Sequence, residues 1–222
     1  MKKHLIGPAV ALILTAGFAA AQQATLDPNR FEPEIRKFEE ADRTSPPPAG
    51  AVVFTGSSSI RRWDTLARDF PHLVVLNRGF GGSEAEHVLR YADRIIVRYR
   101  PSRIVFYAGD NDLARGKTPQ QIAADVQELS ALVHRKLPEA RMAIVSIKPS
   151  LARWHLVTKT REANGLLREL ATKSPHLTFV DVFTPMIGAD GLPIPALFVE
   201  DGLHLTSEGY RVWKQALTPF LR

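Results

Sequence analysis

The stretch AVVFTGSSS at residues 51–59 passes from an uninterrupted apolar run into a glycine and three serines. An apolar run of this length without alternating polar residues is typical of a strand that is buried on both faces of a sheet. A glycine followed by serines favours a tight turn that leads into a helix. These residues therefore predict a buried strand that ends in a polar turn.

The same alternation of strand and helix continues outward from this stretch. Runs of strand length occupy residues 51–54, 73–76, 103–107, 141–147 and 177–182. Segments of helical character occupy residues 31–43, 58–69, 83–99, 119–136, 158–173 and 207–220. Strands that alternate with helices form right-handed crossovers, so the pattern predicts an α/β fold with a parallel sheet that helices cover on both faces.

Four polar motifs follow the predicted strands. Residues 56–59, 77–82 and 109–112 come directly after the first three strands, and residues 201–204 come after the fifth. Functional groups of parallel sheets collect beyond the carboxyl ends of the strands, so we expect the four motifs to meet at one edge. They contain Ser, His and Asp, which together make an activated hydroxyl nucleophile.

The serine motif has two interpretations. Each of Ser57, Ser58 and Ser59 could simply cap the helix that follows, which is the commoner role of serine at such a junction. The accompanying motifs favour a nucleophile, because the helix N-terminus would also stabilise a developing anion. The residues alone do not select one of the three.

The histidine motif carries its own acidic partner. Asp201 lies three residues before His204 and can orient its imidazole within one local turn. Five other histidines lack an acidic partner at a matching loop spacing, so we expect surface or packing roles for His72, His87, His134, His155 and His176. No His-x-x-x-His pair or other ligand cluster predicts a metal site.

The two middle motifs contain candidate hydrogen-bond donors. The glycines of residues 79–82 suggest a dinucleotide-binding loop, but Glu84 stands where that pattern needs a third glycine or alanine. They either shape a tight turn or expose the N–H of Gly82 to an oxyanion. Asn111 either makes a turn, as Asn commonly does, or donates its amide to the same oxyanion.

The motifs together resemble those of the SGNH hydrolases, the GDSL-like lipase/acylhydrolase group. Residues 54–60, FTGSSSI, are similar to the first block of that family, in which the second residue after the glycine is the nucleophile. The resemblance therefore selects Ser58. Ser57 stands where the family usually has Asp, a substitution that the family tolerates.

The remaining blocks imply the other roles. The last glycine of the second block is an oxyanion donor, which implies Gly82, and the G-x-N-D block implies Asn111 beside the Ser58 N–H. The final D-x-x-H block implies that Asp201 and His204 complete a triad. The resemblance also implies a flavodoxin-like three-layer α/β/α sandwich with a five-stranded parallel sheet, and neither a metal nor an organic cofactor.

The N-terminal residues have the pattern of an export signal. Lys2 and Lys3 precede an apolar stretch at 5–18, and three alanines end at Ala21, so we expect cleavage before Gln22. The apolar stretch is shorter than the about 20 residues of a membrane span. An uncleaved anchor is the alternative to a periplasmic or secreted protein. We therefore divide the chain into a signal at 1–21, a helical lead with a Pro-rich linker at 22–50, and a hydrolase domain at 51–222.

Composition narrows the class of partner. The net charge of +6 falls to +4 without Lys2 and Lys3, and the basic residues are spread along the chain. No basic run is interleaved with aromatic residues, which argues against nucleic-acid binding. Cysteine is absent, which excludes both disulfides and thiol catalysis.

The sequence predicts a serine-dependent hydrolase of carboxylic esters. It contains no long apolar lid, which favours small acyl or acetyl esters, carried by a small molecule or a glycan. The alternatives are an O-acyltransferase that acts on a glycan and a non-catalytic glycan-binding module. Trp63, Trp154 and Phe198 could line a substrate pocket or lie in the core, and residues 148–150 could contact a ligand or form only a turn.

Overall fold

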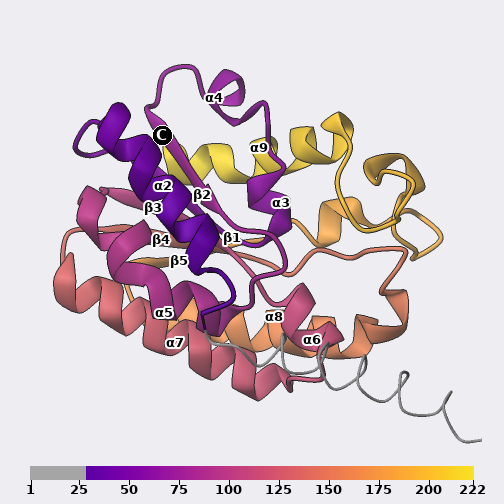
Figure 1. The fold of residues 1–222 in the computed structure, drawn as a ribbon. Helices are drawn as coiled ribbons and strands as arrows, with labels where there is room; N and C mark the ends of the chain where they lie inside the picture. Colours follow the sequence, from indigo (N-terminus) through magenta and orange to yellow (C-terminus); the bar gives the residue numbers. More distant parts are fainter. Residues whose placement is uncertain (1–28) are drawn as a thin grey trace, which may run out of the picture.

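A five-stranded sheet forms the centre of the protein in the computed structural model, which describes residues 29–222 (Figure 1). All of its paired strands are parallel, in the order β2-β1-β3-β4-β5. Their bounds are β1 Val52–Gly56, β2 Val75–Gly79, β3 Arg103–Tyr107, β4 Arg141–Val145 and β5 Leu177–Val180. The strand order reverses between β1 and β3, and ligand sites of such sheets lie at this point. The expected export signal falls outside the described residues.

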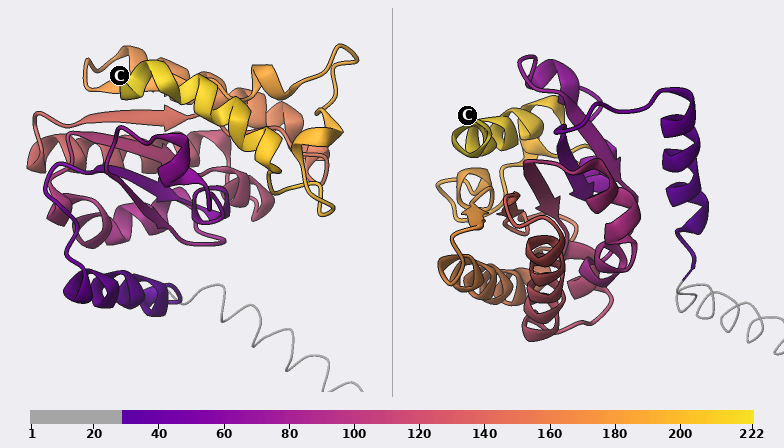
Figure 2. Two further views of the ribbon diagram at one scale, coloured as in Figure 1. Left: turned by 90° about the horizontal axis from the view of Figure 1, so that it is seen from above. Right: turned by 90° about the vertical axis from the view of Figure 1, so that its left-hand side faces the viewer.

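Helices cover both faces of the sheet (Figure 2). The α-helices are α2 Glu32–Thr44, α3 Ser58–Arg61, α4 Leu66–Asp69, α5 Ala85–Ile95, α6 Asp110–Ala114, α7 Pro119–Lys136, α8 Val157–Thr172 and α9 Ser207–Leu221. Within residues 29–222 the connections also contain short 3-10 helices, namely η1 Val97–Tyr99, η2 Trp154–Leu156, η3 Thr184–Met186 and η4 Pro195–Leu197. Buried residues of α5, α7 and α8 share one core cluster, and those of α3 and α9 share the other. The predicted three-layer α/β/α sandwich is therefore confirmed.

The strands contribute alternate side chains to the two cores. Val53 pairs in register with Ile104, and both lie in the core under α5 and α7. Phe54 pairs with Val105, and both lie in the core under α9. This explains why the strands are uninterrupted apolar runs, since each of their faces is covered by helices.

The single helix expected at residues 58–69 is instead two short helices separated by residues 62–65. Trp63 turns inward at the break and is 1% exposed. Its ring stacks on Tyr210 with the centroids 5.0 Å apart, and its indole N–H donates to Asp69 at 2.8 Å. Burial of this large ring against α9 outweighs the local helix preference of the segment.

Helix α2 is fastened to the edge of the sheet by buried charge. Asp42 in α2 forms a salt bridge with Arg78 of β2, and the hydroxyl of Tyr99 donates to the same carboxylate at 2.5 Å. Nearer its start, Glu32 forms an ion pair with Arg94 of α5 at 2.7 Å.

Within residues 29–222, no helix is long and apolar enough to span a membrane.

Candidate active site

The turn after β1 places Ser58 at the first position of α3. Gly56, with φ of +130°, makes this turn possible, because a Cβ there would lie 1.8 Å from the carbonyl oxygen of Tyr107. The close approach allows the N–H of Ser57 to donate to that same oxygen at 3.0 Å. Ser57 and Ser59 are buried, whereas Ser58 is partly exposed, so only the middle serine faces the edge of the sheet.

The loop before α9 brings Asp201 and His204 to the same edge. One carboxylate oxygen of Asp201 accepts the backbone N–H groups of Leu203 and His204, each at 2.8 Å. The other oxygen lies 2.5 Å from Nδ1 of the His204 ring. Partial burial opposes ionisation of Asp201, but these hydrogen bonds outweigh it and hold its pKa well below the usual value.

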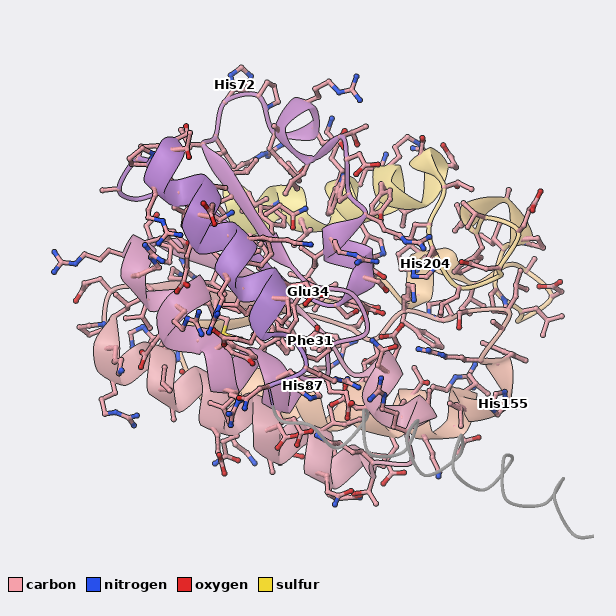
Figure 3. The ribbon with its side chains drawn as sticks, viewed as in Figure 1. Phe31, Glu34, His72, His87, His155 and His204 are labelled. Atoms are coloured by element: carbon pink, nitrogen blue, oxygen red, sulfur yellow. The ribbon has the colours of Figure 1, made fainter. Side chains whose placement is uncertain are left out.

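Ser58 and His204 meet across 146 positions of sequence, with the hydroxyl 2.9 Å from the ring Nε2. Asp201, His204 and Ser58 thus form one continuous chain of hydrogen bonds. Such a chain can remove a proton from a hydroxyl as it attacks, with the carboxylate stabilising the imidazolium. His204 lies apart from His72, His87 and His155 (Figure 3).

The His204 loop is held in place by contacts on both of its sides. The N–H of Val199 donates to the His204 carbonyl at 2.9 Å. After the loop, Thr206 caps α9, and the Tyr210 hydroxyl on α9 donates to the Ser59 carbonyl at 2.9 Å. Helix α9 thus fixes the histidine loop relative to the serine turn.

Two backbone N–H groups are free at the same edge. Neither the N–H of Ser58 nor that of Gly82 donates a hydrogen bond to a protein group within residues 29–222. Gly82 has φ of +78° and precedes α5, and the carbonyl of this glycine accepts from Arg30 at 3.1 Å. Free N–H groups at helix starts are suited to stabilising an oxyanion.

Asn111 contributes a side-chain amide from α6, which directly follows β3. Its Nδ2 donates to the Ser83 carbonyl at 3.0 Å, and its Oδ1 accepts from Arg153 at 3.1 Å. The amide nitrogen has two hydrogens, so one remains available for a ligand. Asn111 is therefore held by two contacts, one to the Gly82 loop and one to the loop after β4.

A comparison with protein families identifies the family of the chain. The model of the GDSL-like Lipase/Acylhydrolase family matches residues 42–212. The chain belongs to this family. The resemblance noted from the motifs is thus confirmed.

Relatives of this GDSL-like acylhydrolase include proteins named as an acetylhydrolase and an esterase. It is 30% identical over 178 residues to platelet-activating factor acetylhydrolase IB subunit alpha1 of Homo sapiens, covering 77% of this chain and 74% of that protein. Among solved structures, a GDSL-like lipase from Bacteroides thetaiotaomicron matches with a TM-score of 0.71 and 19% identity, covering 84% of this chain and 96% of the other. An acetylxylan esterase from Geobacillus stearothermophilus matches with a TM-score of 0.63 and 13% identity, covering 78% and 94%. The family relatives indicate hydrolysis of esters, and the two structures share the fold.

Several candidate ligand contacts of the acylhydrolase are core residues instead. Trp63 and Phe198 are buried among the side chains under α9. Lys148 has a fully buried side chain that forms an ion pair with Asp110 at 3.1 Å. Trp154 alone of the three aromatic candidates is partly exposed. Trp63 and Phe198 therefore belong to the core under α9, whereas Lys148 is buried as the partner of Asp110.

The expectation that His87 lacks an acidic partner was wrong. Glu84 lies three residues before it, and the two side chains form a capping box at the start of α5 in which His87 Nδ1 accepts the Glu84 N–H at 3.1 Å. Burial and the charge of Arg30 lower the pKa of His87 to about 4.

The one cluster of potential metal ligands within residues 29–222 consists of Glu84, Glu86 and His87. Glu84 already forms ion pairs with Arg30, Arg115 and Lys117, which disfavours a cation there.

The sequence did not predict that two arginines lie beside the site. Arg153 contacts Asn111 from the loop after β4, and Arg30 contacts Gly82 from the residues just before α2. The rule that groups gather beyond strand ends could have indicated Arg153, since it follows β4 as residues 148–150 do. No comparable pattern precedes α2, so Arg30 carried no signal.

Proposed function

We propose that this chain is a serine-dependent hydrolase of carboxylic esters, with Ser58, His204 and Asp201 as its triad. The observation that carries the proposal is the continuous hydrogen bonding from Asp201 through His204 to the Ser58 hydroxyl, at 2.5 and 2.9 Å. A merely structural serine cap would need neither the histidine nor its carboxylate. A glycan-binding module would have no use for this chain of contacts either.

The proposed reaction proceeds in two halves. Nε2 of His204 takes the Ser58 proton as Oγ forms a bond to the ester carbonyl carbon, and Asp201 stabilises the resulting imidazolium. The carbon–oxygen bond to the alcohol then breaks, and His204 returns the proton to the leaving oxygen. A water molecule, deprotonated by His204, attacks the acyl-enzyme and releases the acid together with the free serine.

The proposed oxyanion hole has three donors. The N–H groups of Ser58 and Gly82 and the amide of Asn111 would stabilise the negative charge on the former carbonyl oxygen. The two N–H groups have no protein acceptor within the described residues, and the Asn111 amide has one hydrogen to spare. Donors that are fixed before the reaction stabilise charge without reorganising.

We propose small acyl esters, acetyl esters first, as the substrates. The relatives named as an acetylhydrolase and an acetylxylan esterase support this choice. A glycan O-acyltransferase is the chemical alternative, because a sugar hydroxyl could replace water in the second half of the reaction. An exported, periplasmic or secreted enzyme would meet glycan esters outside the cytoplasm.

Hydrolysis of a panel of p-nitrophenyl esters from acetyl to octanoyl, together with acetylated xylo-oligosaccharides, tests the proposal. We expect the acetyl ester to be hydrolysed fastest and Ser58→Ala to lower kcat by about 10⁴-fold or more. Ser57→Ala is the matched control, because Ser57 is buried and its hydroxyl contacts no part of the triad. Transfer of acetyl to an added xylo-oligosaccharide, detected by mass spectrometry at the expense of acetate, would favour the acyltransferase instead.

A further inference from the structure

Arg153 makes a charged contact to the side chain of Asn111, and the proposed mechanism gives this arginine no role. It lies in the loop between β4 and α8, immediately before η2. Its Nη2 donates to Oδ1 of Asn111 at 3.1 Å. Its Nη1 lies 3.2 Å from a carboxylate oxygen of Asp110. One guanidinium group therefore contacts two consecutive residues of α6.

Asp110 gives the guanidinium a fixed anionic partner. Burial opposes ionisation of this carboxyl, but the charges of Lys148 and Arg153 outweigh it and hold its pKa below the usual value. The side chain of Lys148 is fully buried and lies 3.1 Å from the same oxygen of Asp110. Lys148 thus neutralises part of the carboxylate charge and keeps it in position without touching Asn111.

The contacts of Asn111 leave its amide one orientation. The oxygen faces the Arg153 donor, and one N–H faces the Ser83 carbonyl. A flipped amide would place two donors against each other at Arg153 and two acceptors against each other at Ser83. The second N–H of Asn111 is then directed away from both partners. A cation on the carbonyl oxygen also polarises the amide and strengthens its remaining donor.

The loop that carries Arg153 is itself attached to the other half of the site. The N–H of Ala152 donates to the carbonyl of Gly202 at 3.1 Å. Gly202 lies between Asp201 and His204. The position of Arg153 is therefore set relative to both the triad loop and the α6 turn.

We propose that Arg153 is a positioning residue that acts on the reaction through Asn111. It fixes the amide of Asn111 in the donor orientation and increases the positive charge that this amide presents to the oxyanion. This inference rests on the proposed ester hydrolysis. Arg153 needs no contact with the substrate for this role, so its loss should act on the transition state rather than on binding.

A double-mutant cycle with Arg153→Met and Asn111→Ala tests the role. Loss of a whole oxyanion donor costs about 10²–10³ in kcat, and an amide that is only loosened should lose part of that, so we expect Arg153→Met to lower kcat by about 10-fold. KM on p-nitrophenyl acetate should stay within about twofold of wild type. In the Asn111→Ala background, Arg153→Met should change kcat by less than about twofold, since the residue through which it acts is gone.

Two further variants separate positioning from folding and from general charge. Arg153→Lys keeps a cationic donor and should recover part of the lost kcat. Arg36→Met removes a cation from an exposed position on α2 and should leave kcat unchanged. Melting temperatures of all variants identify any that fail to fold. If Arg153→Met fails to fold, Arg153→Lys replaces it in the double-mutant cycle.

Two results would overturn the proposal, because each would mean that Arg153 binds the substrate directly. The first is a double mutant in which the two substitutions lower kcat independently of each other. The second is a rise in KM that accounts for the whole effect of Arg153→Met. A wild-type kcat in folded Arg153→Met would overturn it as well, with Ser58-dependent hydrolysis intact. If instead Ser58→Ala hydrolyses the ester as fast as wild type, the proposed function itself fails, and the role of Arg153 fails with it.

Discussion

The Ser58 hydroxyl owes its position to the residues on either side of it. Gly56 lets the end of β1 approach β3, and the buried Ser57 then leads into α3. Because Ser58 stands at the first residue of a helix and its N–H has no protein acceptor within residues 29–222, this N–H would be free to meet the charge that the proposed attack creates. His204, the proposed base, reaches the Ser58 hydroxyl from the far end of the chain.

At this scale Asn111 is the most specific test of the proposed oxyanion hole. Asn111→Ala should lower kcat on p-nitrophenyl acetate by about 10²–10³, or about 2.7–4 kcal/mol, while KM changes little, because the donor acts only after attack. The Ser58 and Gly82 N–H groups would account for the activity that remains. Stopped assays alongside a melting curve provide the measurement.

Should Asn111 only shape its turn, the outcome would differ. Asn111→Ala would then melt at a lower temperature, and the folded fraction would retain a kcat near that of wild type. That pair of results would remove Asn111 from the oxyanion hole.

Helix α2 is attached to the sheet in part by one buried salt bridge, that between Asp42 and Arg78. Removal of one partner from a buried salt bridge costs about 3–5 kcal/mol, because the other charge remains buried alone. Asp42→Ala should therefore lower the free energy of unfolding by about 3 kcal/mol or more, since it removes the carboxylate that pairs with the buried Arg78 and leaves the Tyr99 hydroxyl without its acceptor. Urea unfolding followed by circular dichroism measures this.

The control for Asp42 is an acidic residue on the same helix that water already surrounds. Glu40 forms only an exposed ion pair with Arg43, at 3.5 Å. Glu40→Ala should change the unfolding free energy by less than about 0.5 kcal/mol. Equal effects of the two substitutions would show that the buried contact does not hold α2.

The capping box at the start of α5 should make stability depend on acid. The pKa of His87 is lowered to about 4 by burial and by Arg30, whereas an unfolded histidine titrates near 6.5. The unfolded chain thus binds the extra proton between these values, so stability should fall as the pH falls from about 6.5 to about 4. His87→Gln removes the titration and can still accept the Glu84 N–H, as Gln does in capping boxes.

We therefore expect the melting temperature of wild type to fall more between pH 7 and pH 5 than that of His87→Gln. Differential scanning calorimetry at both pH values gives the comparison, and the other titrating groups are common to both proteins. An equal fall for the two proteins would show that folding does not lower the pKa of His87.

Across the whole molecule, the sequence predicted the structure best where a single physical cause, such as burial of a strand on both faces, decides it. Buried runs such as residues 103–107 and the placement of polar motifs after them were enough to predict the parallel sheet and the edge at which Ser58 and His204 meet. The break at Trp63 was not predictable, because it depends on stacking against Tyr210, which is 147 positions away. Tertiary packing decides such positions, and local propensity does not contain it.

In the candidate site, too, some features could be predicted from the sequence and others could not. Ser58, Gly82, Asn111, Asp201 and His204 each lie in a short motif, and the structure brings Ser58, His204 and Asp201 into one chain of hydrogen bonds. The contact of Arg153 with Asn111 was not predictable in the same way, because Arg153 follows β4 but lies in none of these motifs. It depends on how two loops that follow different strands approach each other.

The basic and apolar pattern at residues 2–21 concerns the chain as a whole. We expect protein recovered from an exporting host to begin near Gln22, because a basic start, an apolar centre and three alanines make up a cleavable signal. Intact-mass spectrometry of the exported fraction checks this. A chain that retains Met1 in the membrane fraction would indicate an anchor instead.

Covalent labelling tests the central claim most directly. A fluorophosphonate probe reacts with an activated serine, and peptide mapping by mass spectrometry identifies the modified residue. We predict that the adduct lies on Ser58, that it is lost in Ser58→Ala, and that it is greatly slowed in His204→Ala, which lacks the base. An adduct on Ser57 or Ser59, or labelling at wild-type rate in folded Ser58→Ala, would contradict the account.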